Sequence, residues 1–369
     1  MALRSKGRGA PESIRTGGAV AEPLQEACGI VGVYAPKEDV ARLAFFGLFS
    51  LQHRGQESAG IATSDGQQLF CRTEMGLVTQ AFHEFDLQRL PGAIAIGHTR
   101  YSTTGSSVIH NAQPFVTRGV HGQIALGHNG NVINAADLRR ELALEWGCTF
   151  ATSSDSEVIL QMLANAPGAD WGQRWAHVMR RVQGAYSLVV LTPNALMAAR
   201  DPLGVRPLCL GSINGSGWVV ASETCALDHV GAKYVRDIAP GEVVLIDERG
   251  PRSIHNGSDG RSAACVFEFI YFARPDSRLD GRSTYESRVA MGRQLAREHA
   301  VDADVVIGVP DSATAAAAGY SQESGLPYRE GLVKNRYVGR TFIAPDQRIR
   351  DLGVRLKFNP LPEVLSGRR

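Results

Sequence analysis

The sequence has few cysteines, no long apolar run and almost no net charge. Its 369 residues include six cysteines and no C-x-x-C pair, which argues against a disulfide framework and against a self-contained zinc site. No apolar run reaches the roughly 20 residues of a membrane-spanning helix. The formal charge of +2 is too small to favour nucleic-acid binding. These absences predict a cytoplasmic protein with no membrane or nucleic-acid partner.

The length and composition predict two domains. The chain exceeds one typical domain, and 44% of its residues are hydrophobic. Residues 1–27 are rich in Gly, Ala, Arg and Pro without an apolar period, so we expect them to be disordered. Residues 251–264 have a similar polar composition and predict a linker between a domain at 28–250 and a second unit at 265–369.

Cys28 opens the first strand-like run, at 28–34. Glycines and β-branched residues follow it, as is typical of a strand that enters a buried sheet. Taken alone, such a cysteine is more often an inert core thiol than a nucleophile. Three polar clusters that interrupt or end later apolar runs favour the nucleophile, and they occupy 98–103, 127–131 and 153–157.

Several stretches together resemble the class II glutamine amidotransferases. They are Cys28 with the run after it, LQHRGQE at 51–57, GHTRY at 97–101 and GHNG at 127–130. The resemblance extends to about Asn359 and is strongest to the branch that uses phosphoribosylpyrophosphate. It implies an α+β N-terminal nucleophile sandwich (αββα), followed by an incomplete α/β type I phosphoribosyltransferase domain.

The resemblance also implies that residues 1–27 are a propeptide, cleaved between Ala27 and Cys28. Acid–base chemistry gives the reason. An α-amine with a pKa of about 7.7–8 can accept the proton of a thiol with a pKa of about 8.5, whereas an amide nitrogen cannot. The alternative is an ordinary disordered tail.

Four residues are expected to bind glutamine. The guanidinium fork of Arg100 suits the α-carboxylate, and Thr103 adds a hydroxyl donor. The resemblance pairs Asp155 with the α-ammonium, although an acid there also suits the first turn of a helix. It also implies that Arg54 is a supporting residue near the site.

Asn129 and Gly130 are expected to form an oxyanion hole just after a strand. A side-chain amide and a backbone N–H supply two donors for the charge that develops when Cys28 attacks the glutamine amide. Asn-Gly is also the commonest hairpin turn, and only the neighbouring motifs favour the oxyanion hole. The resulting thioester would be hydrolysed to glutamate after ammonia leaves.

The second unit alternates helix-like and strand-like runs, which suggests a parallel α/β sheet. Asp311 and Ser312 lie between a strand and a helix, where backbone N–H groups can hold phosphate. By resemblance, 334–342 is a loop that closes over phosphoribosylpyrophosphate. Its expected binding residues are Lys334, Arg336, Tyr337 and Arg340. Ammonia would displace Mg2+-bound pyrophosphate and give 5-phosphoribosylamine, the first step of purine synthesis.

Cys265 lies where one branch of the family places an iron-sulfur ligand. A 4Fe-4S cluster needs four thiolates, and no cysteine follows Cys265, so we expect a ligand without its partners. After Asp351 the sequence also lacks the paired acids that would bind the ribose hydroxyls. We therefore expect either a fragment of a longer product or a protein that has lost its synthetic half.

Other functions remain open at this point. A truncated relative could act only as a glutaminase, or could bind glutamine without catalysis as a regulatory subunit. Another amidotransferase, such as the one that makes glucosamine 6-phosphate, is disfavoured by the 265–342 region, because that enzyme carries sugar-isomerase domains instead. The family resemblance further implies a homo-oligomer with glutamine and phosphoribosylpyrophosphate as its small-molecule partners.

Overall fold

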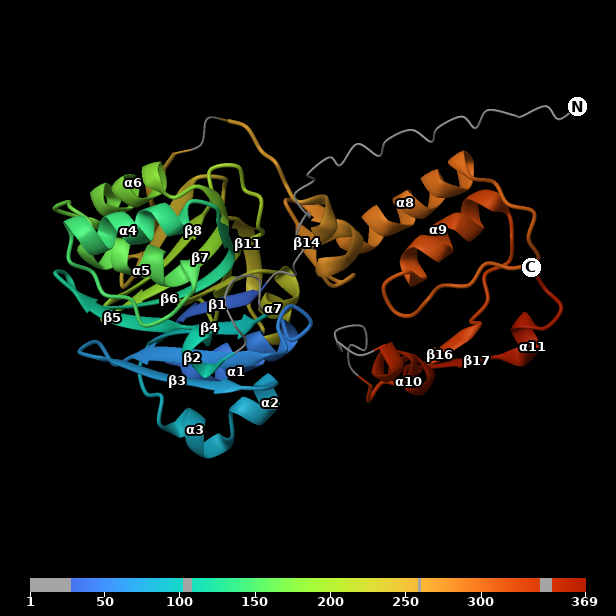
Figure 1. Ribbon diagram of the computed structural model, residues 1–369, viewed down its shortest axis with the longest axis horizontal. Coiled ribbons are helices and arrows are strands. Elements are labelled where there is room, and N and C mark those ends of the chain that lie inside the picture. The colour runs from blue at the N-terminus through green and yellow to red at the C-terminus, as the bar shows by residue number, and fades with distance from the viewer. Residues whose placement is uncertain (1–27, 102–107, 258–259, 339–346) are drawn as a thin grey trace, which may run out of the picture.

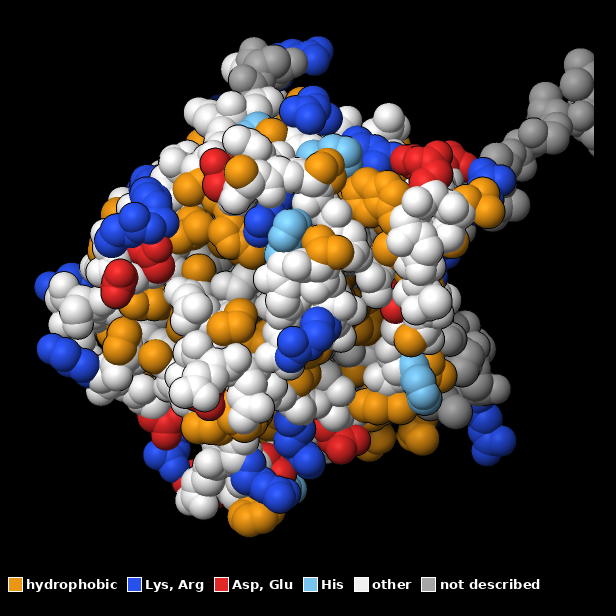
Figure 2. Space-filling model, turned by 90° about the vertical axis from the view of Figure 1, so that its left-hand side faces the viewer, with side chains coloured by type: hydrophobic (Ala, Val, Ile, Leu, Met, Phe, Trp, Pro, Cys, Tyr) orange, Lys and Arg blue, Asp and Glu red, His pale blue; other side chains and the backbone are white. Residues whose placement is uncertain are grey.

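A computed structural model describes residues 28–101, 108–257, 260–338 and 347–369 (Figure 1). Two stacked sheets with helices on both outer faces form the larger part, and a smaller, helix-rich part follows. No helix in the described ranges is long and apolar enough to cross a membrane. The face seen in Figure 2 carries Lys and Arg side chains interspersed with Asp and Glu, in keeping with the small net charge.

The first sheet holds the strand that follows Cys28. In the described residues it has seven antiparallel strands, in the order β11-β9-β10-β1-β4-β2-β3. The strand β1 lies between β10 and β4, and its apolar run is buried on both faces because Val31 and Val33 pack against the helix layer while Ile30 packs against the second sheet. The strands are β1 (Gly29–Tyr34), β2 (Ser58–Ser64), β3 (Leu69–Met75), β4 (Ile94–Arg100), β9 (Cys209–Ile213), β10 (Gly217–Ala221) and β11 (Lys233–Asp237).

The second sheet carries the Asn-Gly pair. Its order among the described residues is β13-β12-β8-β7-β6-β5, again antiparallel. The strands are β5 (Phe115–Gly119), β6 (Gly122–Val132), β7 (Gly184–Thr192), β8 (Ala195–Arg200), β12 (Glu242–Asp247) and β13 (Gly250–Asn256).

Helices cover the outer face of each sheet, and three apolar layers separate the four tiers. Ile30 and Val189 meet in the layer between the sheets. The first sheet is covered by α1 (Val40–Ser50), α2 (Val78–Ala81), α3 (Glu84–Gln88) and α7 (Thr224–His229). The second is covered by α4 (Ala135–Glu145), α5 (Asp155–Asn165) and α6 (Trp171–Arg181), and a short 3-10 turn, η1 (Ile109–Asn111), precedes β5. This arrangement confirms the expected αββα sandwich.

The second part is built around two closely packed helices. Gly292 in α8 and Gly319 in α9 let the backbones approach, because a Cβ at either position would lie about 2 Å from a carbonyl oxygen of the other helix. The elements are the π-helical turn η2 (Glu268–Phe272), β14 (Arg278–Leu279), β15 (Arg282–Ser283), α8 (Thr284–Glu298), α9 (Thr314–Ser324), β16 (Leu332–Lys334), α10 (Gln347–Lys357), β17 (Phe358–Pro360) and α11 (Pro362–Leu365).

Three sequence-based expectations are wrong in detail. Asn129 and Gly130 lie inside β6 rather than after a strand, because β6 stays paired with β7 as far as Val132. β13 occupies part of the expected 251–264 linker, since it pairs with β12. In the described residues the expected parallel sheet is reduced to one parallel bridge, between Val306 and Tyr328, because β16 pairs antiparallel with β17.

Candidate functional site

Cys28 lies at the start of β1, and its side chain is buried. Residues from separate elements line a small cavity with it: Arg100 at the end of β4, Gly130 in β6 and Asp155 at the start of α5. The cavity measures about 10 Å³, roughly the space that one water occupies, so a molecule larger than water enters only if the cavity widens. The expected residue Thr103 lies outside the described residues.

The environment of Cys28 disfavours an unassisted thiolate. Burial raises the pKa of its thiol, whereas the Tyr101 backbone and the cations Arg100 and Arg206 oppose that rise. The thiol lies 3.5 Å from the carbonyl oxygen of Tyr101, to which it donates. A nucleophile in this position requires a nearby base.

Arg100 and Asp155 place opposite charges on one cavity. Both side chains are buried, and both line the cavity with Cys28. Asp155 Oδ2 accepts the backbone N–H of Val132 at 2.8 Å, which fixes the carboxylate, and Ser154 caps the helix that it begins. A cation and an anion about one small cavity suit the two ends of an amino-acid zwitterion.

Asn129 is fully buried, and neither its side-chain oxygen nor its nitrogen has a hydrogen-bond partner among the described residues. It shares a face of β6 with Gly127, where an added Cβ would lie 3.7 Å from Ile30, so this face looks toward the first sheet. An unpaired buried amide costs free energy that a ligand oxygen can recover. Because Asn129 and Gly130 lie inside β6, the alternative of a hairpin turn at this Asn-Gly pair is wrong.

Gly130 cannot be replaced without moving the backbone. Its φ is +153°, and a Cβ would lie 2.0 Å from the carbonyl oxygen of Ala185 in the paired strand. The residue lines the Cys28 cavity directly. Glycine therefore allows β6 and β7 to approach at the point where the cavity forms.

Sequence reasoning missed three polar residues that support this cavity: Gln113, His128 and Ser156. Gln113 Nε2 donates to Ser156 Oγ at 3.0 Å, and Ser156 Oγ lies 2.8 Å from His128 Nδ1. Burial lowers the pKa of His128, which keeps its imidazole neutral although Asp155 opposes the shift. The sequence feature that could have indicated Ser156 is its position directly after Asp155, which was itself an expected site residue.

Arg54 does not line the Cys28 cavity. Its side chain is fully buried, Nε contacts Glu223, and Nη2 donates to Glu268 at 2.6 Å. The next residue, Gly55, packs so tightly on the backbone of Thr99 and Arg100 that a Cβ would lie about 2.5 Å from it. Arg54 therefore supports the strand end that carries Arg100 and makes no contact with the cavity itself.

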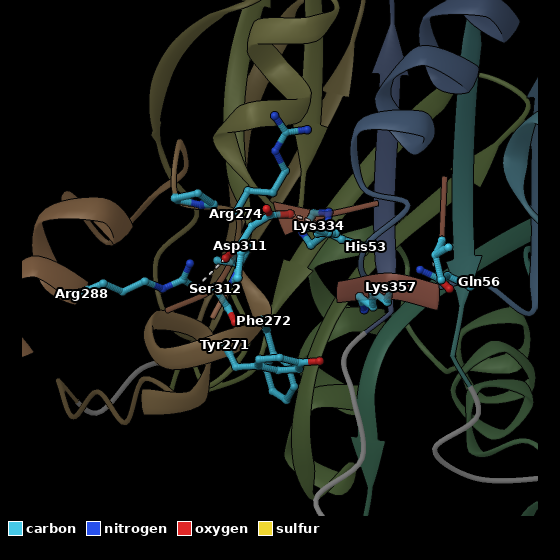
Figure 3. A pocket seen from close by; sticks show the side chains of 14 residues that line it. His53, Gln56, Tyr271, Phe272, Arg274, Arg288, Asp311, Ser312, Lys334 and Lys357 are labelled. Carbon is cyan, nitrogen blue, oxygen red and sulfur yellow. Dashed lines mark hydrogen bonds and ion pairs between the residues drawn. The ribbon is translucent and has the colours of Figure 1, made fainter. Parts of the chain in front are cut away.

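A second cavity, of about 340 Å³, lies where the two parts of the chain meet (Figure 3). Asp311, Ser312 and Lys334 line it together, and Lys334 Nζ contacts the Asp311 carboxylate. Sequence reasoning missed the other polar and aromatic side chains of the lining, which include His53, Gln56, Tyr271, Phe272 and Lys357. The cavity is thus shared between the sandwich and the second part.

The remaining expected residues either do not line this cavity or lie outside the described residues. Arg336 and Tyr337 do not line it, and Tyr337 is 99% exposed. Arg340 and residues 1–27 lie outside the described residues. Cys265 is half-buried, and no group of three or more His, Cys, Asp or Glu in the described residues could hold a metal ion. In the described residues no such group includes Cys265.

Comparisons with known proteins agree with this arrangement. A family model described as a glutamine amidotransferase domain matches residues 98–229. The amidophosphoribosyltransferase of Synechococcus elongatus is 52% identical over 350 residues, which cover 94% of this chain and 71% of that protein. The amidophosphoribosyltransferase of Mycobacterium bovis is 52% identical over 351 residues, which cover 94% of this chain and 66% of that protein.

A solved structure extends the likeness to the fold. Glutamine phosphoribosylpyrophosphate amidotransferase from B. subtilis, complexed with ADP and GMP, superposes with a TM-score of 0.84 at 42% identity, over 93% of this chain and 74% of that one. Proteins of this kind are glycosyltransferases with glutamine amidotransferase activity. Because the sequence matches run through both parts of the chain, they do not favour a relative limited to glutamine hydrolysis. The chain belongs to the amidophosphoribosyltransferase family.

Proposed function

We propose that the chain converts glutamine, phosphoribosylpyrophosphate and water into 5-phosphoribosylamine, glutamate and pyrophosphate. One observation carries the proposal: Cys28, Arg100, Gly130 and Asp155, which come from distant parts of the sequence, line one buried cavity. The family to which the chain belongs gives the acceptor substrate.

The first half-reaction uses Cys28 as the nucleophile. Cleavage after Ala27 frees the α-amine of Cys28, which accepts the thiol proton and so overcomes the effect of burial. Sγ then bonds to the amide carbon of glutamine, while the Asn129 side-chain amide and the Gly130 N–H donate to the developing oxyanion. The C–N bond breaks, the proton goes to the leaving ammonia, and water hydrolyses the thioester to glutamate.

Two buried charges hold the substrate during this step. Arg100 binds the α-carboxylate, with Thr103 as an additional donor, and Asp155 binds the α-ammonium. Arg54 does not touch the substrate. It supports Arg100 indirectly, because the next residue, Gly55, packs on the end of β4. The polar residues Gln113, His128 and Ser156 keep the Asp155 end of the cavity fixed.

The second half-reaction takes place in the cavity between the two parts. Ser312 and the basic residue Lys334 bind phosphate oxygens of phosphoribosylpyrophosphate, and Arg336, Tyr337 and Arg340 belong to the loop that closes over it. Asp311, a carboxylate of the lining, would help to hold Mg2+, which would neutralise the charge of pyrophosphate. Ammonia from the first site then displaces pyrophosphate at ribose C1.

Further features of the proposal concern the whole molecule. We divide the chain into a propeptide at 1–27, a glutaminase domain that begins at Cys28 and includes β13, and a transferase domain that begins at Cys265. All six cysteines are unpaired, which is compatible with the cytoplasm, and we propose a homo-oligomer. An iron-sulfur cluster has no part in these steps.

The test combines mass and activity. The chain is expressed, its N-terminus is determined by intact mass, and ammonia and 5-phosphoribosylamine are measured with and without phosphoribosylpyrophosphate. A start at Cys28 with ammonia release that the Cys28→Ala variant lacks is the expected result, and Cys71→Ala, at the exposed position of β3, is the matched control. An unprocessed start without ammonia release overturns the assignment of Cys28.

A further inference from the structure

One edge of β6, the strand that carries the proposed oxyanion donors, is held by side chains. β5 pairs with this edge as far as Leu126, and β7 pairs with the other edge as far as Val132. The N–H of His128 donates to Gln113 Oε1 at 2.9 Å, and that of Val132 donates to a carboxylate at the start of α5. Backbone groups of alternate residues in a strand point to the same edge, so the N–H of Gly130 faces this edge too.

The carbonyl oxygen of His128 finds its partner in His98 of β4, a residue with no role in the steps above. His98 Nε2 lies 3.0 Å from this oxygen, and the His98 side chain is fully buried. Because a carbonyl oxygen only accepts hydrogen bonds, Nε2 carries the proton and donates it. The peptide bond that contains this carbonyl leads directly into Asn129. His98 therefore holds the peptide unit next to the proposed oxyanion donors.

The surroundings of His98 keep its ring neutral, with a single proton. Burial is the main cause that lowers its pKa to about 3. The hydrogen bond to the His128 backbone opposes this shift, whereas the Arg100 cation and the His128 side chain add to it. With the proton on Nε2, the other nitrogen, Nδ1, is left as an acceptor, and it has no hydrogen-bond partner among the described residues. The Nε2 donor is therefore present throughout the neutral pH range.

His98 also joins the two sheets next to the cavity, although it does not line the cavity itself. In the first sheet it lies directly opposite Ile30 of β1, two residues after Cys28, and it precedes Arg100 by two residues in β4. Ile30 packs in the layer between the sheets, and residues directly opposite each other share a face, so the His98 side chain reaches across this layer to β6. One hydrogen bond thus connects the sheet of the nucleophile to the strand of the oxyanion donors.

We propose that His98 is a positioning residue that fixes the oxyanion donors relative to Cys28. The inference rests on the proposed function, because it takes Asn129 and Gly130 as these donors. Without His98, the buried His128 carbonyl would lose its partner, and β6 would shift to recover one. Oxyanion stabilisation needs donors that are already in place, and a displacement of about 1 Å can cost roughly 100-fold in rate.

The test compares His98→Gln with His98→Asn in the full chain. The side-chain nitrogen of Gln can occupy the place of Nε2 and donate to the same oxygen, whereas the shorter Asn side chain does not reach it. His98→Asn should lower kcat for ammonia release from glutamine by roughly 10- to 100-fold with little change in KM, and His98→Gln should recover most of this loss. His121→Asn is the matched control, because His121 Nε2 lies 2.9 Å from the carbonyl oxygen of Ala166 and neither residue lines the Cys28 cavity.

Two further measurements separate positioning from a general loss of structure. Alkylation of Cys28 by iodoacetamide forms no oxyanion, so its rate should be the same in the wild type and in His98→Asn. The Cys28 peptide is quantified by mass spectrometry, because five other cysteines are present. In an Asn129→Ala background, His98→Asn should cost less than in the wild type, since part of what His98 positions is already gone. Equal kcat values for the Gln and Asn variants, an alkylation rate that falls with kcat, or additive losses in the double variant overturn the inference.

A measurement on the wild-type chain distinguishes this inference from the proposed function. The 15N NMR shifts of the His98 ring should show a proton on Nε2 and none on Nδ1 from pH 6 to pH 8, whether or not glutamine is hydrolysed. If this tautomer is found but glutamine is not hydrolysed, the proposed function fails and the contact stands. If glutamine is hydrolysed but Nδ1 carries the proton, only the role of His98 is wrong. Should His98→Asn not fold, a folded His98→Gln with kcat as low as that of Asn129→Ala overturns the inference.

Discussion

Replacing Arg54 with Met should destabilise the protein strongly at neutral pH. The Arg54 and Glu223 side chains are fully buried and the Glu268 side chain is 3% exposed, so the substitution leaves two carboxylates in the interior without the cation between them. Breaking a buried ion pair from one side costs about 3–5 kcal/mol. We expect about 3 kcal/mol, because Glu223 keeps Ser277 Oγ at 2.6 Å and Glu268 keeps Arg206 at 3.4 Å.

The loss should depend on pH with a defined sign. Burial alone would raise the pKa of Glu223, but Arg54 and His53 outweigh it and hold that pKa well below its usual value. A carboxylate with a depressed folded-state pKa stabilises the fold above its unfolded pKa of about 4.3, and this contribution is lost as the pH falls through the folded value. In Arg54→Met the carboxylate instead favours protonation, so the variant should recover part of its lost stability between pH 8 and pH 5.5.

Urea unfolding at pH 8 and pH 5.5 measures both effects. A loss of about 3 kcal/mol corresponds to a fall in Tm of roughly 6–12 °C for a domain of this size. Arg180→Met, on the exposed face of α6, is the matched control. An equal loss of free energy of unfolding at the two pH values would refute the argument, because a purely steric effect of the shorter side chain has no reason to depend on pH.

Three further variants test the glutamine cavity. Asn129→Ala should lower kcat for ammonia release by roughly 100- to 1,000-fold with little change in KM, as for other lost oxyanion donors. Asp155→Asn should raise KM for glutamine by roughly 10-fold or more, since one charged hydrogen bond is lost. Gly130→Ala should prevent a native cavity, whereas Gly122→Ala, also at a positive φ but with no atom within 4 Å, should retain activity. Steady-state kinetics and thermal unfolding check each outcome.

Local patterns in the sequence predicted those elements whose signals are themselves local. The carboxylate of Asp155 was expected to suit the first turn of a helix, and α5 begins at this residue. The Asn-Gly pair shows the limit of such signals. Its turn propensity is local, but pairing with β7, more than 50 residues away in the sequence, keeps it inside a strand.

Composition misled where a strand is only partly covered. β13 contains Gly, Pro, Arg, Ser, His and Asn, and most of its side chains are half-buried at the end of the second sheet. An edge strand needs few apolar residues, so its sequence resembles a linker. The lining of the second cavity, between the two parts of the chain, was missed for a different reason. His53 and Phe272 come together there only when the two parts meet.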